Sequence, residues 1–455
     1  MTTRVVIVRH AQSSYNTERR IQGRSDASVL TQQGREDSRK VGAALSNLNF
    51  AAIYSSPLQR AKQTAEIIHD CFATAPALTT TDKLLEIDLP LWEGLLVQEV
   101  KEKFPEDYHC WHHHPNELAM LVPQPQGTRE HYPVLALYEQ ARQFWEEVLA
   151  RHAGETILIV GHNGINRALL GTALGMSPSR YHCLQQSNCG ISVLNFAPPY
   201  PPAQGGSTGG SVQLESMNQI AHLGRDVLPS LRPNHQGPRL LLVRHGETEW
   251  NRQTKFQGQI DVPLNDNGRE QARKAGEFLK NVPLEFAFSS PMVRPKETAE
   301  IILQHHPEVK LELLDGLREI GHGLWEGKLE AEIEQTFPGQ LHRWRTVPAQ
   351  VQMPEGENLQ QVWERSVVAW QTILDAIANQ SKIGLVVAHD ATNKVLLCHL
   401  LGLAPDRFWN FRQGNGAVTV IDYPQGPAGL PVLQAMNITT HLGGGVLDKT
   451  AAGAL

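Results

Sequence analysis

The hexapeptide Val5-Val6-Ile7-Val8-Arg9-His10 returns past the middle of the chain as Leu240-Leu241-Leu242-Val243-Arg244-His245. Each copy is a short, branched apolar run, which is typical of a strand buried on both faces of a sheet. Similar runs at 156–160 and 385–387 also lie just before a histidine. We therefore predict four buried strands, each followed by a polar residue able to do chemistry.

The residues that follow the two signatures keep matched spacing. The matched positions, in chain order, are Asn16 and Asn251, Gln22-Gly23 and Gln257-Gly258, Arg60 and Arg294, Glu86 and Glu319, and His162 and His389. An internal repeat of this length indicates two tandem domains of one kind.

Helical patterns lie between the predicted strands. Thr31 before Gln32 to Leu45, and Asn265 before Asp266 to Leu279, are helix starts with capping residues. Strands that alternate with helices predict an α/β fold, with two tandem three-layer α/β/α domains. Ser56-Pro57 and Ser290-Pro291 resemble N-cap and first-turn pairs, and would put Arg60 and Arg294 in the opening turn of a helix.

The Pro- and Gly-rich stretch Pro198 to Ser211 invites a domain boundary, but the repeat argues against one there. Met217-Asn218 recurs as Met436-Asn437, so the segment after the stretch is the last element of domain one. By the same alignment the stretch corresponds to Pro424 to Pro431, a predicted surface loop between two strands. The predicted boundaries are domain one at 1–224, a linker at 225–238 and domain two at 239–455.

The composition limits the partners and the compartment. A net charge of -6 leaves no broad basic surface for nucleic acid or for an anionic membrane. Five cysteines without a Cys-x-x-Cys pair favour neither disulfides nor a zinc site, and indicate a reducing compartment, the cytoplasm. We expect no transmembrane segment, no signal peptide and no metal. The run His112 to His114 is expected in an exposed loop, where three consecutive side chains do not easily share one ion.

The matched polar residues suit phosphoryl transfer through a covalent phosphohistidine. His10 and His245 would attack when neutral, which requires the other ring nitrogen to donate to a fixed acceptor. Glu86 and Glu319 would protonate the leaving oxygen. The predicted phosphate pockets are Arg9, Asn16, Arg60 and His162 in domain one, and Arg244, Asn251, Arg294 and His389 in domain two.

The ordered set His, Asn, Gln-Gly, Arg, Glu, His resembles the histidine phosphatase superfamily, with its phosphoglycerate mutase-like fold. The resemblance implies phosphate monoester hydrolysis of a small phosphorylated metabolite, with no cofactor. It also implies substrate-binding roles for Gln22, Gly23, Gln257 and Gly258. The family signature Arg-His-Gly is intact as Arg244-His245-Gly246 and reads Arg9-His10-Ala11 in domain one. The change to alanine affects a tightly packed backbone position but removes no functional group.

Segments outside this set are similar to those of plant phosphatases of 2-carboxy-D-arabinitol 1-phosphate, an inhibitor of Rubisco. They include Glu86 to Leu89, His131 to Val134 and Gln186 to Val193. Domain one carries an insertion, Leu95 to Tyr138, whose Arg129 and His131 are candidates to bind a substrate carboxylate. Domain two instead carries Pro354 to Asn358, which wider relatives have near the pocket mouth. We therefore expect the two sites to prefer different substrates.

Two other functions fit the same residues. A phosphoglycerate mutase-type shuttle would use the same pocket and pass the phosphoryl group to a second hydroxyl. Alternatively, one domain would sense a phosphometabolite without turnover. Asp390 follows His389 where domain one has Asn163, and would either orient that histidine or weaken phosphate binding by its charge. The sequence leaves these alternatives and the oligomeric state open.

Overall fold

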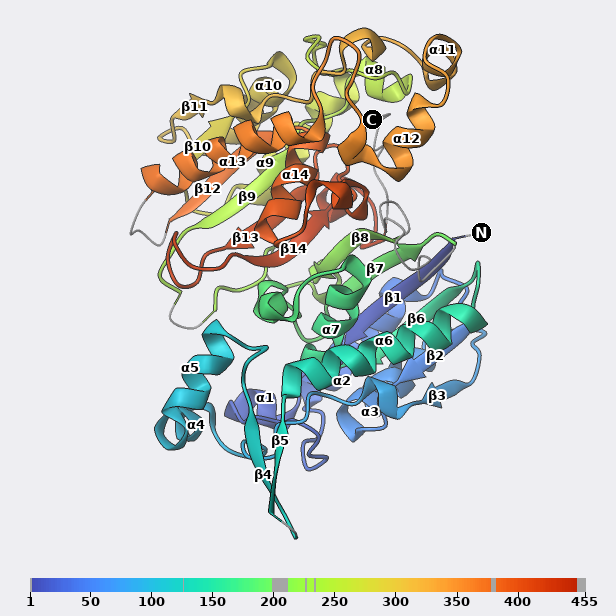
Figure 1. Ribbon diagram of the computed structural model, residues 1–455, viewed down its shortest axis with the longest axis vertical. Helices are drawn as coiled ribbons and strands as arrows, with labels where there is room; N and C mark the ends of the chain where they lie inside the picture. The colour runs from blue at the N-terminus through green and yellow to red at the C-terminus, as the bar shows by residue number, and fades with distance from the viewer. Residues whose placement is uncertain are drawn as a thin grey trace. The chain divides into compact units, whose positions relative to one another are not determined.

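The computed structural model describes residues 2–125, 127–198, 212–225, 227–232, 235–377 and 382–447 (Figure 1). The chain divides into two compact units, residues 1–201 with 218–225, and residues 202–217 with 226–455. The predicted loop at 198–211 lies, apart from Pro198, outside the described residues. The predicted loop at Pro424 to Pro431 is confirmed between two strands.

Unit one is built on a five-stranded sheet in the order β7-β1-β6-β2-β3. Its strands are β1 (Thr3–Arg9), β2 (Ala52–Ser55), β3 (Leu78–Thr80), β6 (Thr156–Gly161) and β7 (Ile191–Phe196). Four strands run parallel, and β7 is antiparallel to β1. The register pairs Arg9 with Gly161. The residues that follow β1 and β6 therefore meet at one edge of the sheet.

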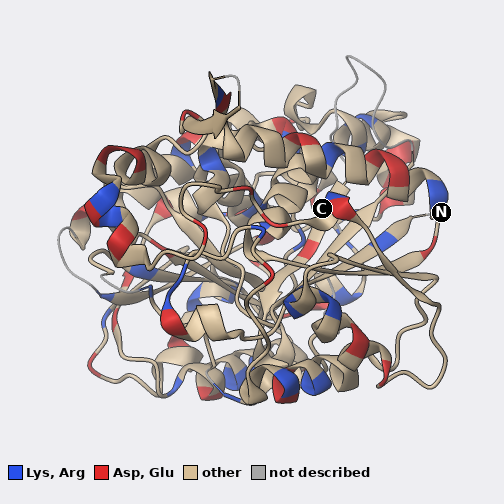
Figure 2. Ribbon diagram, turned by 90° about the horizontal axis from the view of Figure 1, so that it is seen from below, with Lys and Arg blue, Asp and Glu red and all other residues tan. Residues whose placement is uncertain are grey.

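Helices cover both faces of this sheet, as Figure 2 shows. The helices α2 and α3 connect β1, β2 and β3, which step outward along the sheet, whereas α6 leads back from β3 to β6. Right-handed crossovers in opposite directions place helices on opposite faces. The helices and short 3₁₀ turns are α1 (Ser14–Glu18), α2 (Gln32–Leu45), α3 (Gln59–His69), η1 (Asp82–Leu84), α6 (Pro133–Arg151), α7 (Asn163–Leu174), η2 (Pro178–Cys183) and η3 (Ala221–Leu223).

Unit two repeats this plan, with the strand order β11-β10-β12-β9-β13-β14. Its strands are β9 (Arg239–Arg244), β10 (Leu284–Ser289), β11 (Leu311–Leu313), β12 (Ile383–Ala388), β13 (Val418–Asp422) and β14 (Val432–Ile438). Its main helices are α8 (Glu249–Arg252), α9 (Asp266–Leu279), α10 (Val293–Leu303), α13 (Leu359–Ala376) and α14 (Asp390–Leu400). The predicted α/β/α fold and the four buried strands are confirmed.

The capping residues explain where two helices begin and correct two predictions. The side chains of Thr31 and Asn265 accept hydrogen bonds from the third helical residues of α2 and α9, as predicted. The prediction for Ser56-Pro57 and Ser290-Pro291 is wrong, because α3 and α10 begin after Leu58 and Met292. Each serine hydroxyl instead accepts a hydrogen bond from that apolar N-cap residue. Arg60 and Arg294 are nevertheless the second helical residues.

In each unit several short elements lie between the third strand of the parallel set and the longest helix. In unit one they include α4 (Val97–Lys103), α5 (Pro105–His113), β4 (Met120–Gln124) and β5 (Gly127–His131), of which β4 and β5 pair as a hairpin. In unit two the segment from 315 to 350 contains η4 (Asp315–Leu317), η5 (Gly323–Trp325), α11 (Glu330–Thr336), α12 (Gln340–Thr346) and η6 (Pro348–Gln350). The remaining 3₁₀ turns are η7 (Pro405–Asn410) and η8 (Thr440–Leu442).

The run of three histidines is exposed, but the loop prediction is wrong for two of them. His112 and His113 end α5, which Pro105 begins at a position suited to proline. Within the described ranges, no group of three His, Cys, Asp or Glu side chains is arranged to hold a metal ion.

The predicted boundary and the observed units differ at one element. The strand β8 (Val212–Gln219) was expected to end domain one, but residues up to Met217 group with unit two, where Met217 pairs with Met436. Asn218 groups with unit one and accepts a hydrogen bond from the backbone of Ser187. Part of the predicted linker packs on unit two, since Leu228 is buried in its core.

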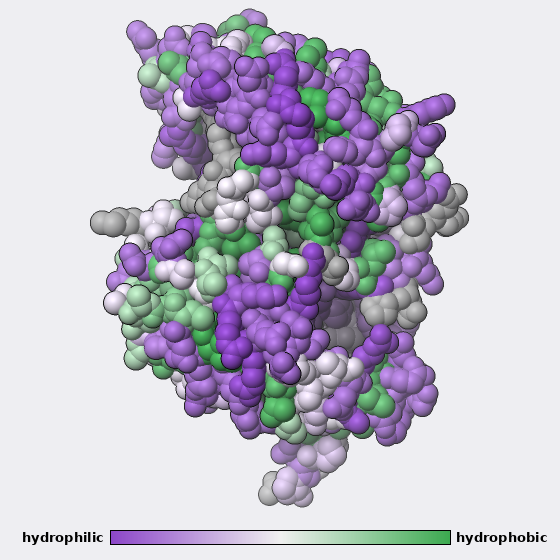
Figure 3. Space-filling view, turned by 180° about the vertical axis from the view of Figure 1, so that it is seen from behind, coloured by the Kyte–Doolittle hydropathy of each residue, from purple (hydrophilic) through white to green (hydrophobic). Residues whose placement is uncertain are grey.

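The surface carries both signs of charge. Lys and Arg are interspersed with Asp and Glu over the helices in Figure 2. Hydrophilic residues cover much of the face drawn in Figure 3, with hydrophobic residues between them. Among the residues that the structure describes, no helix combines the length and apolar character needed to cross a bilayer.

Candidate active site

The strand register brings the two predicted histidines of each domain together. The backbone N–H of His10 donates to the carbonyl of Gly161, 2.8 Å away, and the ring centroids of His10 and His162 are 5.1 Å apart. In domain two the rings of His245 and His389 are 5.2 Å apart. All four histidines are buried.

Backbone carbonyls orient the rings of His10 and His245. Nδ1 of each lies 2.7 Å from the carbonyl of the next residue, Ala11 or Gly246. A carbonyl only accepts, so Nδ1 carries the proton and Nε2 keeps its lone pair. Burial, and then the charges of the nearby arginines, lower the pKa of both histidines well below the usual value. Both are therefore neutral, as a nucleophile must be.

Arg60 and Arg294 lie beside these rings and are held by the loops that the sequence singled out. Their NH2 groups donate to the carbonyls of Gly23 and Gly258, at 2.8 and 2.7 Å. Nε of Arg294 lies 3.3 Å from Nε2 of His245. The glycines thus act on the arginines through their carbonyls.

The glutamines of these loops occupy different settings. Gln22 accepts a hydrogen bond from the Ser13 hydroxyl at 3.1 Å, and Gln257 is buried.

We expect Gly258→Ala to weaken phosphate binding by domain two about 10-fold and to destabilise it by about 1–3 kcal/mol. The glycine has φ +56°, and an added Cβ would lie 2.0 Å from Oε1 of Glu326. That carboxylate is fixed by the backbone N–H groups of Gln259 and Ile260. Phosphate inhibition in a His10→Ala background measures the effect, and Gly426→Ala, at φ +93° in open space, is the control. Equal losses in both variants would contradict it.

Asn16 and Asn251 present their amide nitrogens. The side-chain oxygen of Asn251 accepts from the backbone and hydroxyl of Thr248 and from Nδ2 of Asn415, at 3.1, 3.2 and 3.3 Å. Asn16 makes the matching contacts with Ser13 and Asn188. Since their oxygens are occupied, their amide N–H groups are the ones available to an anion.

The carboxyl groups of the two predicted acids contact the first turn of the helix that follows the second histidine. Glu86 accepts from the backbone N–H groups of Gly164 and Ile165 at 3.0 and 3.1 Å. Glu319 accepts from the backbone of Ala391 at 3.2 Å. Burial, and then the charge of Asp390, raises the pKa of Glu319. A raised pKa suits a carboxyl that delivers a proton near neutral pH.

The two sites differ most at Asp390. Its carboxylate is buried and lies 3.3 Å from NH1 of Arg244 and 2.6 Å from Nζ of Lys394. Domain one has Asn163 and Arg167 at these positions, and Nε of Arg167 donates to the carbonyl of Leu184 at 2.7 Å. Asp390 therefore adds a negative charge to the surroundings of the second pocket that the first pocket lacks.

Two pairs of polar residues that were not predicted from the sequence bind the backbone beside the first histidine of each site. The hydroxyls of Thr64 and Thr298 each accept, at 3.1 Å, from the backbone N–H that follows the first histidine. Asn188 and Asn415 donate to the carbonyls of His10 and His245. Both pairs recur at matched positions, so a search of the repeat for polar matches would have found them.

The candidate carboxylate-binding residues of the insertion occupy different settings. Arg129 is exposed on β5. His131 lies near the loop that carries Glu86, where its Nε2 is 3.0 Å from the carbonyl of Asp88.

Comparisons with known proteins agree with this geometry. A family model described as Histidine phosphatase superfamily (branch 1) matches residues 5–202 and 240–438. A 2-carboxy-D-arabinitol-1-phosphatase of Triticum aestivum is 33% identical over 450 residues, which cover 97% of this chain and 86% of the relative. Phosphoserine phosphatase 1 of Hydrogenobacter thermophilus is 34% identical over 206 residues, 45% of this chain and 94% of that protein.

Among solved structures, Bacillus stearothermophilus YhfR matches with a TM-score of 0.43 and 30% identity, and covers 45% of this chain and 100% of its own. The family model accounts for most of the chain in two copies, which confirms the resemblance drawn from the sequence. The chain therefore belongs to the histidine phosphatase superfamily and is a phosphatase with two tandem domains.

Proposed function

We propose that each domain hydrolyses phosphate monoesters of small sugars or sugar acids through a phosphohistidine, and that domain one acts on 2-carboxy-D-arabinitol 1-phosphate or a related sugar phosphate. One observation carries the proposal. In both domains a carbonyl holds Nδ1 of the first histidine near buried arginines whose charge acts on the ring, and in domain two Nε2 of His245 lies 3.3 Å from Nε of Arg294. This arrangement suits attack on a phosphorus atom whose oxygens the arginines bind.

In the first step Nε2 of His10 or His245 forms a bond to phosphorus while the bond to the ester oxygen breaks. The arginines, the asparagine amide and the second histidine bind the three non-bridging oxygens and stabilise their charge. Glu86 or Glu319 gives its proton to the leaving oxygen, which departs as an alcohol.

In the second step water attacks the phosphohistidine. The same glutamate, now a carboxylate, takes a proton from this water as the new P–O bond forms and the P–N bond breaks. Inorganic phosphate leaves, and the histidine is neutral again. The backbone N–H groups that hold each glutamate keep its carboxyl group in place in both steps.

We expect Glu319→Gln, in a His10→Ala background, to lower kcat on alkyl phosphates about 100-fold or more. Turnover of p-nitrophenyl phosphate should fall far less, because its leaving group needs little protonation. The parent's activity on alkyl phosphates should decline as the pH rises through the raised pKa of Glu319, since only the protonated acid works. The variant should lack that decline. Parallel losses on both substrates would argue against the acid role.

The substrate proposal rests on the similarity to the plant enzymes over nearly the whole chain and on the insertion of domain one. Phosphate release from 2-carboxy-D-arabinitol 1-phosphate, arabinitol 1-phosphate, 3-phosphoglycerate and phosphoserine tests it in a His245→Ala background. We expect selective turnover of the first compound. Strong turnover of phosphoserine or 3-phosphoglycerate instead would overturn the assignment.

Arg129→Ala and His131→Ala test which residue binds the carboxylate. We expect Arg129→Ala to lower the preference for the carboxylated over the plain sugar phosphate about 10-fold, about the effect of one charge-assisted hydrogen bond. The exposed Arg142→Ala, on the following helix, is the control. An unchanged ratio in both insertion variants would exclude the insertion from carboxylate binding.

A further inference from the structure

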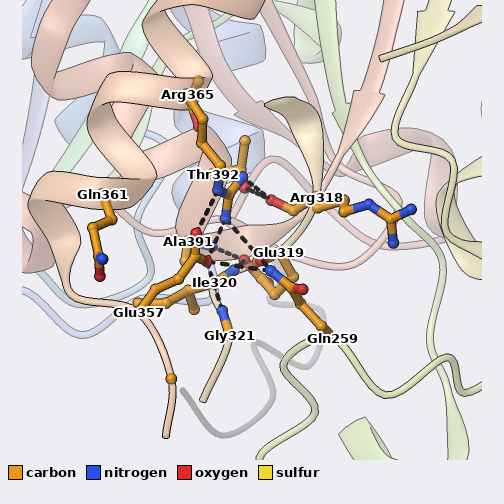
Figure 4. Close-up of polar contacts among 12 residues, drawn as sticks. Gln259, Arg318, Glu319, Ile320, Gly321, Glu357, Gln361, Arg365, Ala391 and Thr392 are labelled. Atoms are coloured by element: carbon orange, nitrogen blue, oxygen red, sulfur yellow. Dashed lines mark hydrogen bonds and ion pairs between the residues drawn. The ribbon is translucent and has the colours of Figure 1, made fainter. Parts of the chain in front are cut away.

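The loop that carries Glu319 is held from the side by one arginine (Figure 4). Arg365, on α13, donates to three carbonyls of this loop, those of Gly316, Arg318 and Glu319, at 3.0, 2.6 and 2.9 Å. These bonds are made to the backbone of the loop and not to the carboxyl group of Glu319. Arg365 thereby fixes the backbone position from which the Glu319 side chain extends.

Glu357 connects the same arginine to the segment at the predicted pocket mouth. Its two oxygens accept from Nε and NH2 of Arg365, each at 2.8 Å, in a bidentate ion pair. Its carboxylate also accepts from the backbone N–H of Gly321 at 2.8 Å and from Nε2 of Gln259 at 3.3 Å. Its own N–H donates to the Gly321 carbonyl at 2.7 Å. Both charged side chains are 21% exposed, so water screens the pair only in part.

The segments that meet at this pair all belong to the site. Gln259 follows Gly258, whose carbonyl holds Arg294, and also donates to the carbonyl of Glu319 at 3.1 Å. Thr392 donates to the carbonyl of Arg318 at 2.6 Å. The pair thus connects the acid loop with the loop that orients the phosphate-binding arginine.

Domain one holds the matching carbonyls with different side chains. Gln140, on α6, donates to the carbonyls of Lys83 and Leu85, which lie three residues and one residue before the acid, as Gly316 and Arg318 do. Arg24 follows Gly23 as Gln259 follows Gly258. It donates to the Glu86 carbonyl at 3.2 Å and to Gln140 at 3.0 Å.

The two domains have therefore exchanged an arginine and a glutamine between two positions. In domain one the arginine is on the loop after the glycine and the glutamine is on the helix, and in domain two the reverse holds. The same backbone carbonyls are bound in both arrangements. Because different side chains bind the same carbonyls in the two domains, we infer that fixing the loop that carries the acid matters to the site.

We propose, on the basis of the proposed phosphatase function, that Arg365 with Glu357 is the positioning element of the Glu319 acid, and that Arg24 with Gln140 does the same for Glu86. In this role they act on the main chain of the loops that carry the acids. They set the distance between the carboxyl group and the leaving oxygen. Their removal should therefore lower kcat for substrates whose hydrolysis is limited by proton transfer to the leaving oxygen.

The test measures the activity of domain two in the full chain, where His10→Ala inactivates domain one. It uses two substrates. Glycerol 3-phosphate has an alkoxide leaving group that needs a proton, and p-nitrophenyl phosphate does not. We expect Arg365→Gln to lower kcat on glycerol 3-phosphate about 10- to 30-fold, within the range of general acid catalysis, and kcat on p-nitrophenyl phosphate less than about 3-fold. Glu357→Gln should shift both rates in the same direction by smaller factors.

The exchanged arrangement supplies the rescue. The double variant Gln259→Arg with Arg365→Gln installs in domain two the residues of domain one, and should restore kcat on glycerol 3-phosphate to within about 3-fold of the parent. Arg273→Gln, which removes only an exposed ion pair on α9, is the matched control. Thermal unfolding of each variant checks that the domain is folded.

Three outcomes would overturn parts of the inference. Equal losses on both substrates, or no loss on either, would refute the positioning role of Arg365. Failure of the double variant to recover would refute the equivalence of the two arrangements. Absence of any turnover by the His10→Ala parent would overturn the proposed function of domain two, and with it the role of the pair.

Discussion

A protein carrying both His10→Ala and His245→Ala is expected to lose all phosphatase turnover, at least about 1000-fold, since each substitution removes the nucleophile of one site. Each single variant should keep the activity of the other domain, because the two rings are held by separate sets of contacts. The single variants will therefore divide the substrate profile of the parent protein into two parts.

Covalent labelling measures this directly. Brief incubation with a ³²P-labelled substrate, followed by alkaline quenching, should label each single variant at the remaining histidine and leave the double variant unlabelled. His113→Ala, at the exposed end of α5, is the control and should match the parent. Loss of all turnover in His10→Ala alone would mean that domain two is a sensor without catalysis.

Asp390→Ala is expected to destabilise domain two by about 3–5 kcal/mol, the range found when one partner of a buried ion pair is removed. Lys394 and Arg244 would both lose this counterion while they remain buried. Lys394 also lies over the rings of Phe408 and Trp409, at 5.0 and 4.7 Å from their centroids, which confines its ammonium group to that place.

Calorimetry on the whole chain tests this, with domain one as an internal reference. Asn163→Ala, the matched substitution in domain one, should cost less than about 1 kcal/mol because no ion pair is broken. The double variant Asp390→Asn with Lys394→Met should recover part of the loss, since it removes the buried ammonium group that Asp390 neutralised, while Arg244 stays charged and keeps its hydrogen bond to the carbonyl of Gln413. A small effect of Asp390→Ala would show that water reaches Lys394.

The strands and the main helices are predictable from the sequence because their signals are local. Branched apolar runs define β1, β6, β9 and β12, and capping side chains define the starts of α2 and α9. The repeat supplies what local signals lack, namely that the histidines, arginines and glutamates belong to one site. A pattern that occurs twice at matched spacing is far stronger than either copy.

Other features depend on contacts between distant segments, which one chain's pattern does not specify. The hydrogen bonds that Arg60 and Arg294 donate to the carbonyls of Gly23 and Gly258 join residues 37 and 36 positions apart. The position of Lys394 beside Asp390 could have been inferred from their spacing of four on one helix. The pairing of Asp390 with Arg244 could not, because it depends on how α14 packs against the end of β9.

The contacts described for each site join residues of its own half. Natural selection can therefore act on the two sets of contacts separately. One copy can preserve an existing reaction while its twin accumulates changes such as the Asp390–Lys394 pair or the arginine on α13. A duplicated gene fused in this way provides a second site that can acquire a new specificity within one polypeptide. Both copies are inherited and expressed together.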